Sequence, residues 1–214
     1  MSTRTLFTFI TLLFVFTSVS AQEKTIELFN GKNLDNWEFV LADPGISSSK
    51  VFTVKEGIIH IVGEPFGYMQ TKEEFENFHL YVEWRWPEVA TNSGIFVFVQ
   101  DEKKVWPKCI EMQLHAGDAG DLVLMAGADL KEYQQEAGKE RPAFPIVKKK
   151  DSSSENPVGE WNHAEIICHS GNVRVFINGV FQNSGSESSV KKGRIALQSE
   201  GKAIEFRNVR LTKL

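Results

Sequence analysis

The sequence has 214 residues with 24 basic and 28 acidic side chains, which gives a net charge of −4 at pH 7. This mild acidity argues against a nucleic-acid-binding protein, because such proteins normally present a basic patch. The only two cysteines, Cys109 and Cys168, are too few for a disulfide scaffold, and we expect them to be unbridged.

The first 21 residues have the pattern of a cleavable secretory signal peptide. Arg4 supplies a positive charge, residues 6–16 are mostly apolar, and residues 19–21 form a small-residue cleavage site. The apolar stretch is shorter than the roughly 20 residues that a transmembrane helix needs. We therefore expect cleavage before Gln22, a periplasmic or secreted location, and no membrane insertion.

The rest of the chain predicts a single all-β domain over residues 22–214. Short apolar or alternating runs are separated by turn residues, and such runs are typical of the strands of a sandwich or jelly roll. The expected strands cover 26–29, 51–54, 58–62, 78–86, 94–100, 109–115, 161–169, 173–177, 194–198 and 203–211. The alternation in the last of these changes phase, which predicts a bulge near residues 207–208.

Three connections between these strands have sequence signals of their own. Asn178-Gly179 predicts a two-residue hairpin, since both residues tolerate a positive φ. Residues 72–76 and 129–137 are the only stretches that could be helical. Residues 138–159 are polar and contain prolines, which favours a long surface loop, with a flap over a site as the alternative.

Two strands carry polar rows opposite their apolar positions. In residues 78–86 the row is His79, Tyr81, Glu83 and Arg85, and in residues 109–115 it is Glu111, Gln113 and His115. Neither row contains a lysine, the residue expected on an ordinary solvated face, so we interpret them together as one recognition surface. Short hydrogen-bonding groups beside an aromatic ring suit a hydroxyl-rich ligand such as a sugar. The alternative is an outer face in which Arg85 pairs with Glu83 or Glu111.

The absence of several common motifs excludes some classes of enzyme. The sequence has no G-x-S-x-G elbow, no P-loop and no G-x-G-x-x-G motif. The strand at 109–115 offers one glutamate where retaining glucanases of this sandwich type place paired carboxylates, which disfavours their mechanism. Asp118 and Asp121 could bind a metal or cap turns, but their spacing fits no established metal motif.

Six segments in order then resemble one known family. They are LFNGKNLDNWE (28–38), FHLYVEWRW…NSGIFV (78–97), IEMQLHAGDAGD (110–121), GEWNHAEI (159–166), FINGV (176–180) and GRIALQSEGKAIEFRNVRL (193–211). They are similar to the 3-keto-disaccharide hydrolases, whose members are also described as 3-keto-glucoside 1,2-lyases and 3-keto-2-hydroxy-glucal hydratases. The resemblance covers nearly all of residues 22–214 and implies a concanavalin-like jelly roll of two antiparallel sheets with little helix.

The resemblance also implies a reaction and a set of roles. A base removes the C2 proton of an oxidised, 3-keto sugar, the group at C1 is eliminated, and hydration gives 3-keto-glucose. Glu111 or His115 is the expected base, while Arg85, Asn92 and Gln113 are expected to orient the sugar, with Glu83 and Tyr81 nearby. No cofactor is certain, and a divalent ion held by Glu111, His115 and Asp121 is an additional possibility.

The sequence departs from the family at two positions. Many members have an aspartate where this chain has His115, and many have a histidine before the last glycine, where this chain reads Ser199-Glu200-Gly201.

Two non-enzymatic alternatives also stay open. One is a carbohydrate-binding domain with an aromatic platform made by Tyr81 and Trp106, and the other is a surface-assembly domain with the polar face as its interface.

Overall fold

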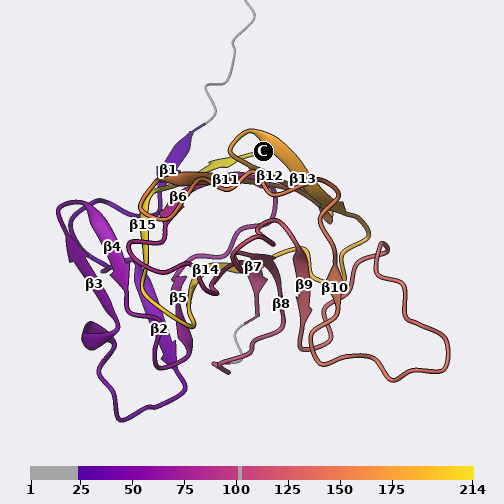
Figure 1. Ribbon diagram of the computed structural model, residues 1–214, viewed down its shortest axis with the longest axis horizontal. Coiled ribbons are helices and arrows are strands. Elements are labelled where there is room, and N and C mark those ends of the chain that lie inside the picture. Colours follow the sequence, from indigo (N-terminus) through magenta and orange to yellow (C-terminus); the bar gives the residue numbers. More distant parts are fainter. Residues whose placement is uncertain (1–23, 101–102) are drawn as a thin grey trace, which may run out of the picture.

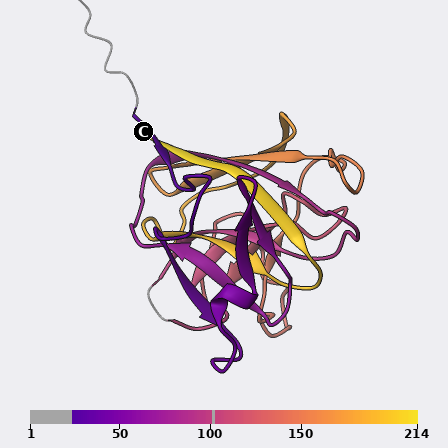
Figure 2. The same cartoon turned by 90° about the vertical axis from the view of Figure 1, so that its left-hand side faces the viewer.

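The computed structural model describes residues 24–100 and 103–214, which form two antiparallel β-sheets packed face to face (Figure 1). The predicted signal peptide lies outside the described residues, so its cleavage and the export of the protein stay predictions. From the side, the two sheets form separate layers, with the orange region of β11–β13 uppermost (Figure 2). This is the predicted all-β, concanavalin-like jelly roll.

Sheet A contains eight strands in the order β13-β12-β11-β6-β15-β4-β3, with β1 paired to β15. Their bounds are β1 (Thr25–Glu27), β3 (Phe52–Lys55), β4 (Ile58–Ile61), β6 (Phe78–Arg85), β11 (Asn162–His169), β12 (Asn172–Ile177), β13 (Val180–Gly185) and β15 (Ile204–Lys213). The predicted hairpin joins β12 to β13, and Asn178 and Gly179 have φ values of 51° and 78°. The predicted bulge is confirmed by the register shift between Arg207 and Arg210 in β15.

Sheet B contains seven strands in the order β10-β9-β8-β7-β14-β5-β2. Their bounds are β2 (Trp37–Leu41), β5 (Gly67–Thr71), β7 (Gly94–Val99), β8 (Cys109–Gln113), β9 (Leu122–Met125), β10 (Ile146–Val147) and β14 (Arg194–Ser199). Every residue of β7 is buried, so this strand is covered on both faces.

Neither stretch that could have been helical is a helix. Within residues 72–76 the chain makes an isolated bridge from Phe75 to Gly193, and residues 129–137 are irregular apart from turns at 131–132 and 137. The helical content of the described chain is one 3₁₀ turn, η1 (Ser48–Lys50). Across those same residues, no helix is long and apolar enough to span a membrane.

Alternating side chains from the two sheets fill the space between them. Sheet A contributes apolar residues such as Leu80 and Trp84, and sheet B contributes residues such as Ile110 and Met112. Cys109 and Cys168 are free and buried in different sheets, β8 and β11, as expected for an unbridged pair.

A second, smaller apolar cluster lies on the outer face of sheet B, opposite the main core. Its members are Tyr68, Phe96, Val99, Cys109, Val123, Met125 and Ala196, with Val40 and Trp106 packed against them. Side chains from the surrounding loops therefore cover much of this outer face. Polar groups that share this face lie in a partly enclosed setting rather than in open water.

Candidate functional site

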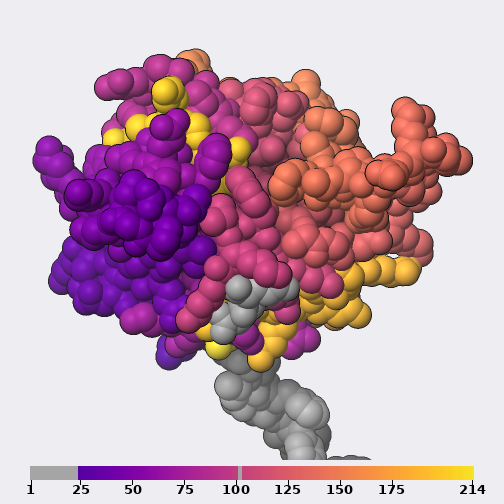
Figure 3. All heavy atoms as spheres, turned by 90° about the horizontal axis from the view of Figure 1, so that it is seen from below, coloured from indigo at the N-terminus to yellow at the C-terminus, as the bar shows by residue number. Residues whose placement is uncertain are grey.

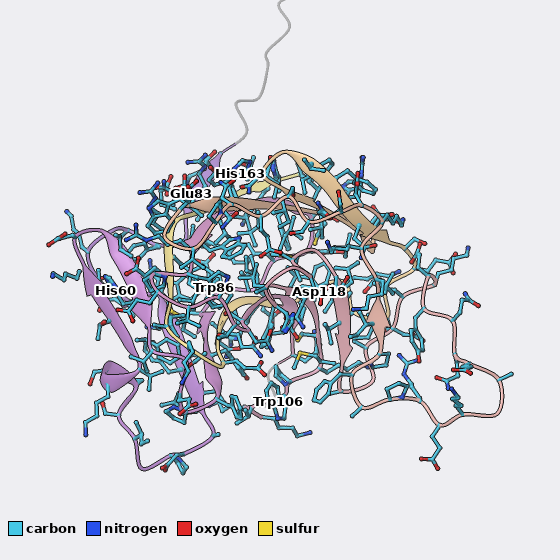
Figure 4. The ribbon with its side chains drawn as sticks, viewed as in Figure 1. His60, Glu83, Trp86, Trp106, Asp118 and His163 are labelled. Atoms are coloured by element: carbon cyan, nitrogen blue, oxygen red, sulfur yellow. The ribbon has the colours of Figure 1, made fainter. Side chains whose placement is uncertain are left out.

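The two polar rows that the sequence suggested would form one surface lie on opposite outer faces of the sandwich. Strand β6 belongs to sheet A and strand β8 to sheet B, and both turn their apolar residues toward the shared core. Figure 4 shows Glu83 and His163 on the upper sheet and Trp106 at the far side of the lower one. The expectation of one shared surface is therefore wrong. Period-two alternation determines which side of a strand a residue takes, and it does not determine which sheet the strand joins.

On the outer face of sheet A, the charged groups of the first row are paired with residues of β15. The Nε atom of Arg207 lies 2.5 Å from Oε2 of Glu83, and the Nε atom of Arg85 lies 2.5 Å from Oε2 of Glu205. The ring of Trp161 lies under both guanidinium groups, 4.6 Å from Arg85 and 4.0 Å from Arg207. The alternative of a salt-bridged outer face is therefore the correct one for this strand. The pairs differ from those expected, because Arg85 pairs with Glu205 and not with Glu83 or Glu111.

Tyr81 and the carboxylate of Glu83 are held in the same network. The Tyr81 hydroxyl donates to Glu83 at 3.1 Å, its ring stacks on His163 at 5.5 Å, and the guanidinium of Arg210 lies 4.1 Å from the ring centre. Burial acts to raise the pKa of Glu83, but hydrogen bonds from Asn208, Arg207 and Tyr81 outweigh it and lower the pKa. These groups stabilise one another and present few unpaired atoms to a ligand.

The outer face of sheet B contains a cavity of about 230 Å³. Figure 3 looks at the molecule from this side, where the indigo N-terminal part and the orange part near residue 150 lie on either side of the magenta middle part of the chain. The cavity is lined by Asn92, Trp106, Glu111, Gln113, Val123, Met125, Phe144, Ile146 and Glu200. Three residues that the sequence singled out for the site, Asn92, Glu111 and Gln113, therefore do come together.

Glu111 is the most unusual group in this cavity. Its side chain points away from the core, yet only 5% of the residue is exposed, because loops cover this face. Its carboxyl group makes no hydrogen bond with any residue in 24–100 or 103–214. Burial and, to a smaller extent, the negative charge of Glu200 raise the pKa of Glu111 to about 8. The carboxyl is therefore mostly protonated at neutral pH.

The glycine at position 94 gives the Glu111 side chain its room. Gly94 starts β7 and pairs with Gln113 of β8, and Phe96 pairs with Glu111, so Gly94 is a diagonal neighbour of Glu111 on the same face. A Cβ atom at this position would be 2.2 Å from Oε1 of Glu111. Any larger residue at position 94 would therefore displace the carboxyl group.

Glu200 is a site residue that the strand pattern did not reveal. It follows the end of β14, and its Oε2 accepts a hydrogen bond from Nε2 of Gln198 at 2.6 Å. Burial raises the pKa of Glu200, while hydrogen bonds from Asn92 and Gln198 and the charge of His115 act to lower it. The only signal in the sequence was the departure from the family pattern at Ser199-Glu200-Gly201, because a loop position has no periodicity to place it.

Several amide oxygens on or beside this face have no partner within the described chain. They are Oδ1 of Asn92, Oε1 of Gln198 and Oε1 of Gln70, and each is fully enclosed. Gln70 pairs with Ala196 of the outer-face cluster, which places its side chain on the same face as Gln198. Buried polar atoms are almost always hydrogen-bonded in folded proteins. Of these three residues Asn92 lines the cavity, so its unpaired oxygen is the one that suits a ligand that donates a hydrogen bond.

His115 and Asp121 do not join Glu111 in a metal site. His115 is exposed, and its Nδ1 lies 3.3 Å from Oδ2 of Asp118. Asp121 is buried, and its two oxygens accept hydrogen bonds of 2.7 Å from the Lys148 ammonium and the Lys149 backbone N–H. No three metal-ligating side chains gather anywhere in the described part of the chain. The predicted trio does not fit a divalent ion, and we derive no step through one.

Comparisons with known proteins agree with this architecture. Residues 24–212 match the family described as the 3-keto-alpha-glucoside-1,2-lyase-like domain. A 3-keto-disaccharide hydrolase from Bacteroides thetaiotaomicron is 25% identical over 172 residues, which cover 69% of this chain and 53% of that protein. This chain therefore spans about half the length of that relative.

Solved structures of similar fold include proteins with low sequence identity. A protein from Parabacteroides distasonis, provisionally named a glycosyl hydrolase, has a TM-score of 0.67 at 22% identity, with 94% of this chain and 98% of that one covered. The β-glucanase of Bacillus licheniformis has a TM-score of 0.55 at 9% identity, with 91% and 99% covered. At these identities the likeness extends to the fold.

Proposed function

The chain belongs to the 3-keto-alpha-glucoside-1,2-lyase-like family, and from this membership and the cavity of sheet B we propose that it is an enzyme that cleaves 3-keto-glucosides. The observation that carries the proposal is the state of Glu111. A buried carboxyl with no hydrogen-bond partner, a pKa raised to about 8 and a second carboxyl beside it is typical of an acid–base site.

The reaction requires two proton transfers and no oxidant. A ketone at C3 acidifies the proton at C2, so a base can remove it while the bond between C1 and the glycosidic oxygen breaks. The departing oxygen takes up a proton, which leaves a 3-keto-2-hydroxy-glucal and a free alcohol. Water then adds across the double bond, with its hydroxyl going to C1 and a proton returning to C2, and the product is 3-keto-glucose.

The two carboxyl groups suit the two proton transfers. Glu111 is mostly protonated at neutral pH, so it can donate a proton to the departing oxygen. Burial also raises the pKa of Glu200, but hydrogen bonds from Asn92 and Gln198 oppose that rise, so of the two carboxyls Glu200 is the better placed to act as a base. We therefore assign the C2 base to Glu200, in place of Glu111 or His115. A positioned acid or base contributes about 10²–10⁴-fold to the rate.

The same pair can carry out the hydration. After elimination, Glu200 holds the proton from C2 and Glu111 is a carboxylate. Glu111 can then remove a proton from the attacking water. The proton on Glu200 exchanges with solvent before hydration, and Glu200 then protonates C2, so both groups end in their starting states. Gln113 lines the same cavity, and its amide can donate to the negative oxygen that develops at C3.

The test uses 3-keto-trehalose beside unoxidised trehalose, both in D₂O. We expect glucose and 3-keto-glucose from the oxidised sugar alone, with one deuterium on C2 of the 3-keto-glucose. Incubation of 3-keto-glucose with the protein measures exchange after the reaction, and this value is subtracted. Equal cleavage of both sugars would instead indicate conventional hydrolysis by two carboxyl groups.

Two other results would contradict the enzyme proposal. Binding of 3-keto-trehalose without turnover would indicate a carbohydrate-binding domain, and neither binding nor turnover would favour the surface-assembly alternative. Either result would leave the fold and the geometry of the cavity unchanged.

A further inference from the structure

The cavity of sheet B has two chemically different ends. The polar side chains of Asn92, Gln113 and Glu200 line one end. Glu111, Val123 and Ile146 form one row across the strands, and from this row to Met125, two residues further along β9, the lining is apolar apart from Glu111 and includes Trp106 and Phe144. A cavity divided in this way fits a ligand with one polar and one apolar half.

The apolar end continues into a chain of three aromatic rings on the surface. The ring centre of Trp106 lies 5.8 Å from that of Phe66 and 5.6 Å from that of Phe144. Phe66 and Phe144 are 43% and 44% exposed, and Ile146 beside them is 38% exposed. Isolated exposed apolar residues are common on proteins, but a contiguous group of them marks a binding surface.

The chemistry of this end indicates what it binds. A second sugar ring would bring several hydroxyl groups, and each would lose hydrogen bonds to water when it is enclosed without a partner. Apart from the indole N–H of Trp106, the apolar side chains that line this end offer no side-chain donor or strong acceptor. A flat apolar group would lose nothing on enclosure and would stack on Trp106.

We propose that this apolar end binds the leaving group of the substrate, and that the protein prefers 3-keto-glucosides whose aglycone is aromatic. The inference rests on the proposed function for the position of the sugar, at the polar end beside Glu111 and Glu200. It adds the class of leaving group, which the family description does not specify.

Direct binding separates this inference from the reaction. Phenyl α-glucoside and methyl α-glucoside share the sugar and the anomeric configuration, and neither is oxidised, so calorimetric titration measures affinity without turnover. We expect the phenyl glucoside to bind about 10-fold more tightly, which is the gain that one buried aromatic ring supplies. Trp106→Ala should remove most of this difference.

Turnover provides a second readout. Comparing wild type with a variant removes the difference in chemical reactivity between the two leaving groups, because that difference is the same for both proteins. A phenolate leaves more readily than an alkoxide in any protein, so the informative quantity is the phenyl-to-methyl ratio of kcat/KM for the 3-keto-glucosides, compared between wild type and Trp106→Ala. We expect that ratio to fall about 5- to 10-fold in the variant. Phe144→Ala, at an exposed position, should lower it in the same direction and serves as the second variant if Trp106→Ala folds poorly.

The matched control is Trp161→Ala, which removes a tryptophan from the outer face of sheet A, where Trp161 contacts Arg85 and Arg207. It should leave the phenyl-to-methyl ratio unchanged. Equal affinity for the two glucosides, or a ratio that neither Trp106→Ala nor Phe144→Ala changes, would overturn the aromatic leaving-group site even if 3-keto-trehalose is cleaved. Phenyl-selective binding without any turnover would instead contradict the proposed reaction and leave the aromatic site standing.

Discussion

Glu111 connects the sequence pattern, the burial of the site and its chemistry. The strand alternation directs its side chain away from the core, and the loops over sheet B then remove it from water. Burial disfavours the charged form of a carboxyl, and the neighbouring charge of Glu200 acts in the same direction. A protein retains such a group at a cost in stability, so the cost should be measurable.

The pH dependence of unfolding should contain a component from Glu111. Its pKa is raised from 4.5 to about 8, so between these values the folded protein holds a proton that the unfolded chain has released. The stabilising contribution of this group is fully present below the unfolded pKa and is lost as the pH rises through the folded pKa. The slope is at most about 1.4 kcal/mol per pH unit.

The measurement is urea unfolding at about pH 5.5 and about pH 7.5 for wild type and Glu111→Gln. The amide of glutamine stays neutral, so the free energy of unfolding of the variant should fall less between the two pH values. If the two proteins lose the same amount of stability, the carboxyl of Glu111 titrates in its ordinary range and the acid role proposed for it fails.

At the scale of the strands, the pairing of β7 with β8 positions Glu111, the proposed acid. Gly94 has no side chain, which lets the carboxyl of Glu111 occupy the space above β7. The φ angle of Gly94 is not in the left-handed region, so alanine fits the backbone there, and the clash with Glu111 is the main effect of a substitution.

Gly94→Ala should therefore lower activity more than stability. We expect kcat/KM for 3-keto-trehalose to fall about 100-fold, since a displacement of about 1 Å in a catalytic group has an effect of that size. The matched control is Gly45→Ala, where the new Cβ would meet only Oδ1 of Asp43, at 3.1 Å, outside the cavity. Full activity of Gly94→Ala in a kinetic assay would show that the position of the Glu111 carboxyl does not matter.

Much of the strand structure could be predicted, because it depends on local chemistry. Alternation gave the correct inward residues of β6 and β8, Asn178-Gly179 gave the hairpin, and the change of phase near Arg207 gave the bulge. The assignment of β6 and β8 to different sheets was missed, because strand pairing is a long-range property. Glu200 and Phe144 were missed for a related reason, since loops bring them to the cavity. Trp106 was singled out, but the aromatic platform that it was to form with Tyr81 is wrong, because Tyr81 lies on the outer face of sheet A.

At the scale of the whole molecule, the two outer faces differ in how their polar groups are paired. On the outer face of sheet A, arginines, carboxylates and aromatic rings are paired with one another, as with Glu83 and Arg207 or Arg85 and Glu205. On the outer face of sheet B, a cavity is lined by the buried carboxyl of Glu111 and by Asn92, whose amide oxygen has no partner in the described chain. The central claim is that the reaction takes place on the second face.

The most direct test compares one glutamate from each face. Glu111→Gln changes the cavity of sheet B, and Glu165→Gln changes the outer face of sheet A, where Glu165 contacts His79 at 2.8 Å. Kinetics with 3-keto-trehalose should show a loss of about 10²–10⁴-fold in kcat/KM for Glu111→Gln and a change within about twofold for Glu165→Gln, with thermal unfolding confirming that both variants fold. Retained activity in Glu111→Gln together with a large loss in Glu165→Gln would place the reaction on the other side of the molecule and contradict the account.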